Sequence, residues 1–106
     1  MPITLCEEEI DLYTRAAKLW NMRFLEDLLI GEMAELTSAI LNKRRNREHH
    51  DENVEEEITD VLIVMEDMIL RLNDDSKLNR WRVFKLDMLK NRVETAEAGK
   101  KMTDNQ

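Results

Sequence analysis

Apolar residues recur along most of the chain at intervals of three and four positions, the spacing that places them on one face of a helix. Polar segments divide this pattern into four predicted helices, at residues 6–19, 23–45, 53–73 and 76–96. The first break falls at Asn21 and Met22, where the apolar pattern changes phase. The second is the wholly polar segment 46–53, which predicts a loop in which Asn53 caps the third helix. The third, 73–76, offers several side chains that favour a helix N-terminus.

The composition also favours an all-α fold. The chain has two Gly and one Pro among its 106 residues, so it contains few of the residues that form turns between strands. We therefore predict a four-helix, antiparallel protomer with a single domain over residues 1–96. The apolar spacing ends there, and residues 97–106 are predicted to form a flexible tail. A domain of this size buries only about two-thirds of its unfolded surface, so self-association would stabilise it.

The net charge narrows the range of partners. It is −7 at pH 7, whereas a general nucleic-acid binder usually presents a basic surface that displaces counterions from phosphates. We therefore expect no nucleic-acid partner, and we expect that any polyanion is handled through bound cations. The single cysteine, Cys6, and the lack of a signal-peptide pattern favour the cytoplasm. The longest apolar run, Val61–Met65, is far too short to cross a membrane.

The second predicted helix carries an acidic residue where an apolar one is expected. At about 100° per residue, one stripe of this helix contains Leu28, Leu29, Leu36, Ala39 and Ile40. Glu32 falls close to the centre of the stripe, and Glu35 falls at its edge. An ionised carboxylate is rarely buried without a partner. Something must therefore compensate the charge of Glu32.

The third predicted helix repeats this pattern. Glu57 lies in the margin of its wide apolar face, and Asp60 lies further round. Residues three positions apart are neighbours on a helix, so Glu32 with Glu35 and Glu57 with Asp60 form two carboxylate pairs. If the two helices pack antiparallel through their apolar faces, the four carboxylates converge. A set of ligands made only of carboxylates suits Mg²⁺, or Mn²⁺ as a substitute, better than Zn²⁺.

Acidic pairs of this spacing also occur as ordinary surface charge, especially in a chain of which 37% of the residues are charged. A single pair would be interpreted in that way, and we interpret Glu7–Glu9 as surface charge. Two pairs on successive helices, each interrupting an apolar stripe, favour a metal site instead.

The runs Gly31–Leu36 and Glu56–Leu62 resemble the paired E-x-x-E and E-x-x-D motifs of the MazG-like all-α nucleoside triphosphate pyrophosphatases. The resemblance extends from about Leu25 to Leu72, and more weakly through Lys85–Val93. Many members have Glu-Glu where this chain has Gly31-Glu32, but the branch that resembles the dCTP pyrophosphatases also has Gly-Glu there. The exact subfamily is therefore left open.

The resemblance implies an activity and an assembly. Members hydrolyse nucleoside triphosphates to the monophosphate and pyrophosphate, which controls or sanitises nucleotide pools, and they work as dimers or tetramers. The same four carboxylates would hold Mg²⁺ and serve as the catalytic residues. Members carry basic or amide side chains late in the fourth helix, where this chain has Lys85, Lys90 and Arg92. These three are candidates to contact phosphates, although basic residues near a helix C-terminus also complement its dipole.

Two further residues have both a functional and a structural interpretation. Trp20 falls where the dCTP-like branch has residues of the base pocket, so its ring could stack on a nucleobase, or it could belong to the core. Asp67 follows Asp60 by two turns and could act as an auxiliary ligand, but we favour surface charge.

The competing function is a non-catalytic helical interaction module in which the acidic pairs form salt bridges. A family member that binds nucleotide without cleaving it is a third alternative. Glu32 favours the enzyme, because a surface module has no reason to keep a carboxylate at the centre of an apolar stripe. The sequence names neither the preferred base and sugar nor the general base.

Overall fold

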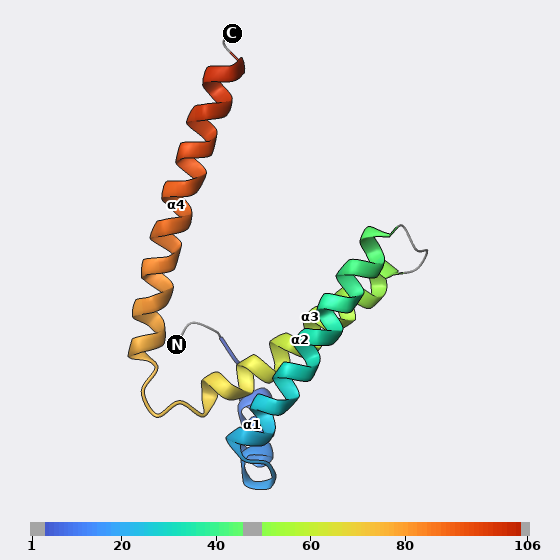
Figure 1. The fold of residues 1–106 in the computed structure, drawn as a ribbon. Helices are drawn as coiled ribbons and strands as arrows, with labels where there is room; N and C mark the ends of the chain where they lie inside the picture. The colour runs from blue at the N-terminus through green and yellow to red at the C-terminus, as the bar shows by residue number, and fades with distance from the viewer. Residues whose placement is uncertain (1–3, 46–49, 105–106) are drawn as a thin grey trace. The chain divides into compact units, whose positions relative to one another are not determined.

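The computed structural model describes residues 4–45 and 50–104, and all of their regular secondary structure is helical (Figure 1). The four helices are α1 (Glu7–Leu19), α2 (Met22–Arg44), α3 (His50–Leu70) and α4 (Ser76–Asp104). The predicted all-α class is therefore confirmed. The structure divides into two units, Leu5–Asn73 and a second unit that contains α4. The boundary between the units lies at the polar segment that separates the last two helices, and the single domain predicted over residues 1–96 stays a prediction.

The break between α1 and α2 lies where the apolar pattern changes phase. Trp20 ends α1 in an extended conformation, and Asn21 is the N-cap of α2. The side-chain oxygen of Asn21 accepts a hydrogen bond of 2.9 Å from the backbone N–H of Phe24. This bond satisfies one of the backbone donors that a helix leaves free at its start, so a new helix begins directly after the old one ends.

Within the first unit, α2 and α3 form an antiparallel hairpin, and α1 packs on α3 (Figure 1). The buried apolar side chains are few, and they lie at the contacts between these helices: Tyr13, Leu25, Ala39 and Val64. Among the described residues, no large side chain is wholly buried. The unit therefore has a thin core, and much of its apolar surface stays exposed.

Arg71 fastens the end of α3 to the turn between α1 and α2. Its guanidinium donates to the carboxylate of Asp67 at 2.8 and 3.4 Å, and to the backbone carbonyl of Trp20 at 2.6 Å. One turn earlier on α3, Glu66 accepts a hydrogen bond of 2.7 Å from the hydroxyl of Tyr13 on α1. Burial and this bond both raise the pKa of Tyr13 above its ordinary value. These polar contacts hold α1 against α3.

The bounds of α3 differ from the prediction at both ends. The helix begins at His50, so Asn53 lies inside its first turn instead of capping it. The predicted loop was inferred from polarity alone, but residues 50–53 contain no Gly or Pro and can continue a helix. The remaining loop residues, 46–49, lie outside the described residues. The helix ends at Leu70, and the backbone N–H of Arg71 donates to the backbone carbonyls of both Asp67 and Met68.

The second unit is built on α4. Before its start, the side chain of Asp74 accepts a hydrogen bond of 2.9 Å from the backbone N–H of Ser76, which lowers the pKa of Asp74. The helix continues beyond Ala96 to Asp104, so the loss of apolar spacing does not end it. Ala, Lys, Met and Glu in this stretch are good helix formers, and Gly99 costs only about 1 kcal/mol relative to Ala. The predicted tail is therefore helical as far as Asp104, and its flexibility stays a prediction.

Candidate metal centre

Four carboxylates from two helices meet within the first unit. Glu32 and Glu35 lie one turn apart on α2, and Glu57 and Asp60 lie one turn apart on α3. One carboxylate oxygen from each residue lies within 4.8 Å of the corresponding oxygens of the other three. The antiparallel hairpin thus brings together the two pairs that the sequence predicted would converge.

The four residues differ in burial. Glu35 is exposed, whereas Glu32, Glu57 and Asp60 are half-buried. The Oε2 atoms of Glu32 and Glu57 are fully shielded from solvent, and neither has a hydrogen-bond partner among the described residues. A buried polar atom without a partner loses its hydration without compensation, which costs on the order of 1–3 kcal/mol and more for a charged group. Two such atoms in one cluster require an explanation.

The electrostatics of the cluster are repulsive. Burial raises the pKa of Glu32 above its ordinary value, and the negative charges of Glu35 and Asp60 raise it further. Burial is also the main cause that raises the pKa of Glu57, followed by the charge of Glu35. Desolvation and like charges both disfavour the ionised form. The ionised cluster therefore needs a positive counter-charge.

A divalent cation fits this set of groups. The donors are all carboxylate oxygens, which hard cations such as Mg²⁺ and Mn²⁺ prefer. The two unpartnered oxygens of Glu32 and Glu57 would gain a ligand bond in place of the water that burial removes. Glu32, Glu35, Glu57 and Asp60 could therefore hold a metal ion, each through one oxygen.

Asp67 is not the surface charge that the sequence analysis favoured. Its side chain is buried and forms an ion pair with Arg71 at 2.8 Å. Asp67 and Arg71 have the i,i+4 spacing of helix ion pairs. That spacing, within an otherwise apolar stretch, is the feature of the sequence that indicates the ion pair. Asp67 is thus a partner of Arg71 and lies outside the group of four carboxylates.

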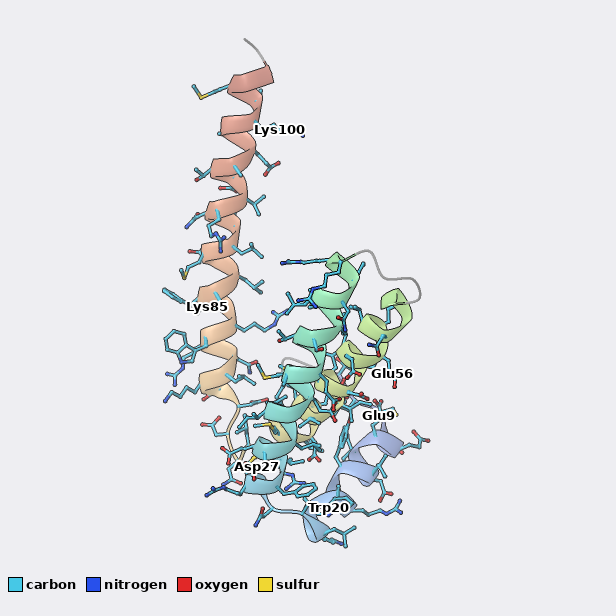
Figure 2. All side chains as sticks on the ribbon, turned by 45° about the vertical axis from the view of Figure 1, so that its right-hand side comes forward. Glu9, Trp20, Asp27, Glu56, Lys85 and Lys100 are labelled. Atoms are coloured by element: carbon cyan, nitrogen blue, oxygen red, sulfur yellow. The ribbon has the colours of Figure 1, made fainter. Side chains whose placement is uncertain are left out.

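Trp20 lies at the turn between α1 and α2, as Figure 2 shows. Its ring stacks on that of Phe24, with 5.7 Å between the ring centroids and 17° between the planes. The indole is exposed, so the interpretation of Trp20 as a core residue is not supported. A role in stacking on a nucleobase stays a prediction.

The three predicted basic residues, Lys85, Lys90 and Arg92, lie on α4 and are exposed. They therefore belong to the second unit, whereas the carboxylates belong to the first. The ammonium of Lys85 lies 5.8 Å from the centroid of the Trp81 ring (Figure 2 labels Lys85). Contact between these residues and a phosphate stays a prediction.

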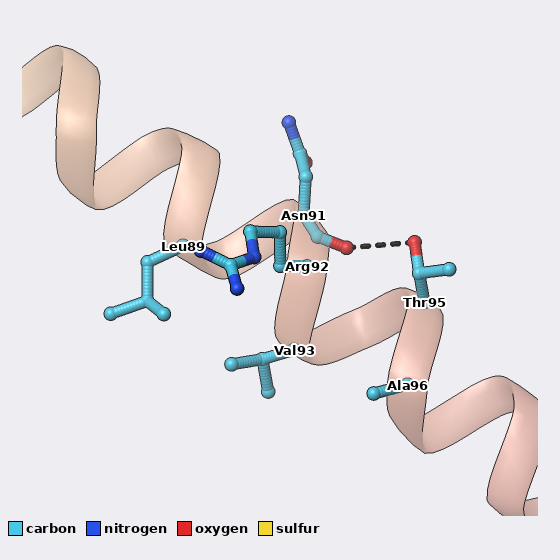
Figure 3. A pocket seen from close by; sticks show the side chains of 6 residues that line it. All are labelled: Leu89, Asn91, Arg92, Val93, Thr95 and Ala96. Carbon is cyan, nitrogen blue, oxygen red and sulfur yellow. Dashed lines mark hydrogen bonds between the residues drawn. The ribbon is translucent and has the colours of Figure 1, made fainter.

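A shallow pocket on α4 includes Arg92 but shows no convergent chemistry (Figure 3). It is lined by Leu89, Asn91, Arg92, Val93, Thr95 and Ala96. All six belong to one helix, and the hydroxyl of Thr95 donates to the backbone carbonyl of Asn91 at 2.8 Å. This is the surface of a single helix, without the converging polar groups from several elements that ligand sites usually present.

Comparisons of the chain with protein-family models, with curated proteins and with solved structures give no match. Among the described helices, none is both long enough and apolar enough to cross a membrane. The two features that point to a function are the geometry of the four carboxylates and the motif resemblance of the two helices that carry them.

Proposed function

We propose that this chain is a Mg²⁺-dependent nucleoside triphosphate pyrophosphohydrolase, which converts a nucleoside triphosphate and water into a monophosphate and pyrophosphate. The observation that carries the proposal is the pair of buried, unpartnered oxygens on Glu32 and Glu57 inside a cluster of four carboxylates. Their arrangement on two antiparallel helices agrees with the resemblance of Gly31–Leu36 and Glu56–Leu62 to the MazG-like motifs.

The four carboxylates have the chemistry that the reaction requires. Glu32, Glu35, Glu57 and Asp60 would hold the cation and leave part of its coordination sphere for the triphosphate. When bound, Mg²⁺ neutralises phosphate charge and lowers the pKa of a coordinated water. Glu35 is the one exposed member of the cluster, so it faces the side from which a polyanionic substrate would approach.

The non-catalytic interaction module accounts for less of the geometry. In that alternative the acidic side chains form salt bridges to a partner at the surface. The Oε2 atoms of Glu32 and Glu57 are shielded from solvent by this chain itself, so a partner on the surface cannot reach them directly. A small cation bound within the cluster can contact these oxygens.

The decisive experiment is a screen of common and damaged nucleoside triphosphates with and without Mg²⁺, with products identified by phosphorus NMR. The proposal expects monophosphate and pyrophosphate, formed only with the metal. Diphosphate and orthophosphate would contradict it, because they report cleavage at a different bond. The variant Glu57→Gln should lose the activity, and Glu7→Gln, which changes an exposed carboxylate of α1, should keep it.

Metal binding can be measured separately from turnover. A ligand that binds only the folded protein stabilises it by about 2.7 kcal/mol at a concentration of 100 times its Kd. Millimolar Mg²⁺ should therefore raise the melting temperature of the wild type. Stabilisation without hydrolysis of any nucleotide would favour the alternative of a nucleotide-binding, non-cleaving homologue. A melting temperature that does not change with Mg²⁺ would contradict the proposed metal site.

A further inference from the structure

Gly31 lies in the interior of α2, directly before Glu32 and one turn before Glu35. A glycine inside a helix destabilises it relative to alanine, and it is usually explained by a close approach that a side chain would prevent. A Cβ atom added at Gly31 would have no heavy atom of the described residues within 4 Å, apart from its sequence neighbours and the backbone of its own helix. Packing among the described residues therefore does not account for this glycine, and the space beside it is open to a ligand.

This open space borders the candidate metal centre. Gly31 and Glu35 are i,i+4 neighbours on the surface of α2, and both are exposed. The Cα–Cβ bonds of a helix tilt toward its N-terminus, so that of Glu35 points toward the turn that contains Gly31. Glu35 is the one exposed member of the cluster. A ligand that binds the cation from the exposed side therefore lies next to Gly31.

Gly31 is the middle of a line of exposed residues along α2. Phe24, Gly31 and Ser38 follow one another at intervals of seven residues, which is about two helical turns. They therefore fall within about 20° of one line, with about 10.5 Å along the axis between successive members. Glu35 lies beside this line, between Gly31 and Ser38. An elongated ligand on the cation can extend along the line in either direction.

The two directions differ in their chemistry. Toward the start of α2 the line passes the exposed carboxylate of Asp27 and reaches Phe24, whose ring stacks on that of Trp20 (Figure 2 labels Asp27 and Trp20). A carboxylate repels phosphate, but it accepts hydrogen bonds from the hydroxyl groups of a sugar. Toward the end of α2 the line passes Ser38 and Asn42. These side chains are uncharged and can donate hydrogen bonds to phosphate oxygens.

We propose that the nucleoside triphosphate binds along α2 in one orientation, with its phosphate chain on the cation and toward Ser38, and its nucleoside over Gly31 and toward Phe24. The missing side chain at Gly31 gives the sugar room beside the metal-bound phosphates. Gly31 is thus a specificity-determining residue that acts through space and carries no charge. This inference rests on the proposed function, because it places the substrate of that reaction.

The variant Gly31→Leu fills this space and tests the orientation. With the nucleoside triphosphate that the wild type hydrolyses best, KM should rise by about tenfold or more, and kcat should change less, because all four carboxylates remain. Binding of pyrophosphate together with Mg²⁺, measured by isothermal titration calorimetry, should be unchanged, because pyrophosphate has no nucleoside. The melting temperature of the variant should rise, since leucine favours a helix more than glycine does.

The matched control is Gly99→Leu, which makes the same change in the other glycine of the chain. Gly99 lies within α4, and a Cβ atom added there would also meet no heavy atom within 4 Å among the described residues, apart from its sequence neighbours and the backbone of its own helix. This variant should likewise gain thermal stability, and its KM and kcat should equal those of the wild type. The two glycines then differ only in what lies beside them.

Other outcomes would overturn the inference. An active wild type whose KM is unaffected by Gly31→Leu would reject the role of Gly31 and leave the proposed function standing. Weaker binding of pyrophosphate to this variant would place the phosphate chain over Gly31 and reject the orientation. If Gly31→Leu does not fold, Gly31→Ala decides: its KM should rise by a smaller factor, and an unchanged KM would reject the inference. A wild type that hydrolyses no nucleoside triphosphate would reject the proposed function and this inference with it.

Discussion

Acidic side chains on α3 are found in two different environments. Toward the end of the helix, Asp67 is buried against the guanidinium of Arg71, and Glu66 accepts a hydrogen bond from Tyr13. One to three turns earlier, Glu57 and Asp60 face two more carboxylates from α2. In the first environment each charge has a partner from the chain. In the second, buried oxygens of Glu32 and Glu57 have none among the described residues.

The contrast shows what the chain itself can supply. A buried carboxylate is tolerated when a cation or a donor is placed beside it, and Arg71 and Tyr13 fill these roles for Asp67 and Glu66. Near its C-terminus, α3 therefore provides each acidic side chain with a partner from the chain, whereas nearer its N-terminus it does not. A departure that brings four carboxylates together is the pattern expected when the positive charge comes from outside the chain. Variants at each end of α3 test this difference.

The largest effect is expected for Glu32→Gln, which keeps the shape of the side chain and removes its charge. Activity should fall by at least two orders of magnitude, because a ligand of the cation is lost. Without metal, the variant should melt at a higher temperature than the wild type, since it relieves repulsion and desolvation. Its gain from Mg²⁺ should shrink. Thermal melts with and without Mg²⁺, together with a pyrophosphate-release assay, measure all three effects.

The control is again Glu7→Gln, which should behave like the wild type in each assay. If Glu32→Gln instead lowers the metal-free melting temperature and leaves the Mg²⁺ response unchanged, Glu32 has a structural partner and is not a metal ligand.

At the other end of α3, Arg71→Ala should destabilise the protein by about 3 kcal/mol, because it leaves Asp67 buried without its counter-charge. The Mg²⁺-induced gain should persist, since the carboxylate cluster keeps all its groups. Chemical denaturation with and without Mg²⁺ measures both quantities. Arg15→Ala is the matched control: it removes an ion pair with Asp11 of the same i,i+4 spacing, at 3.3 Å, in which both side chains are 68% exposed.

Exposed pairs of this kind contribute about 0.5 kcal/mol or less. Equal losses of stability for the two arginine variants would mean that burial does not distinguish the pairs, and the contrast between the two ends of α3 would lose its basis.

The smallest effect concerns pH. The pKa values of Glu32 and Glu57 are raised in the metal-free folded protein above the ordinary value of 4.5. The folded protein therefore keeps protons on these groups that the unfolded chain has released. Their contribution to stability is present below that ordinary pKa and is lost as the pH rises through the raised values. The metal-free melting temperature of the wild type should fall in this interval relative to that of the double variant Glu32→Gln, Glu57→Gln.

Titrating the melting temperature of both proteins from about pH 4.5 upward measures this difference. Parallel curves would show that the two carboxyls titrate as they do in the unfolded chain. Saturating Mg²⁺ should reverse the sign for the wild type, because the cation binds the ionised groups.

Much of the first unit could be predicted from the sequence, because apolar spacing reports burial directly. The positions of Glu32 and Glu57 in apolar stripes predicted that these residues would face each other, and the hairpin confirms this. The start of α3 and the end of α4 could not be predicted in the same way. Residues 50–53 and 97–104 are polar or lack apolar spacing. A helix can continue through such residues without burying an apolar face, so the pattern of apolar residues does not indicate where it ends.

The contacts of Arg71 illustrate a different limit. Its pairing with Asp67 is local and has a recognisable spacing, but its hydrogen bond to the carbonyl of Trp20 joins residues 51 positions apart. A backbone carbonyl carries no side-chain signature in the sequence. Only the fold shows that the end of α3 meets the turn between α1 and α2, and the same holds for the bond between Tyr13 and Glu66.

These two bonds also bear on the order in which the chain folds. The α2–α3 hairpin joins neighbouring segments, whereas the bonds from Tyr13 to Glu66 and from Arg71 to Trp20 close loops of more than 50 residues. Closing a long loop costs entropy that only the finished contact repays. The hairpin should therefore form first and α1 should dock afterwards. Within the first unit, we therefore expect α1 to detach from the hairpin before α2 and α3 separate, so its backbone amides should exchange with solvent before those of α2.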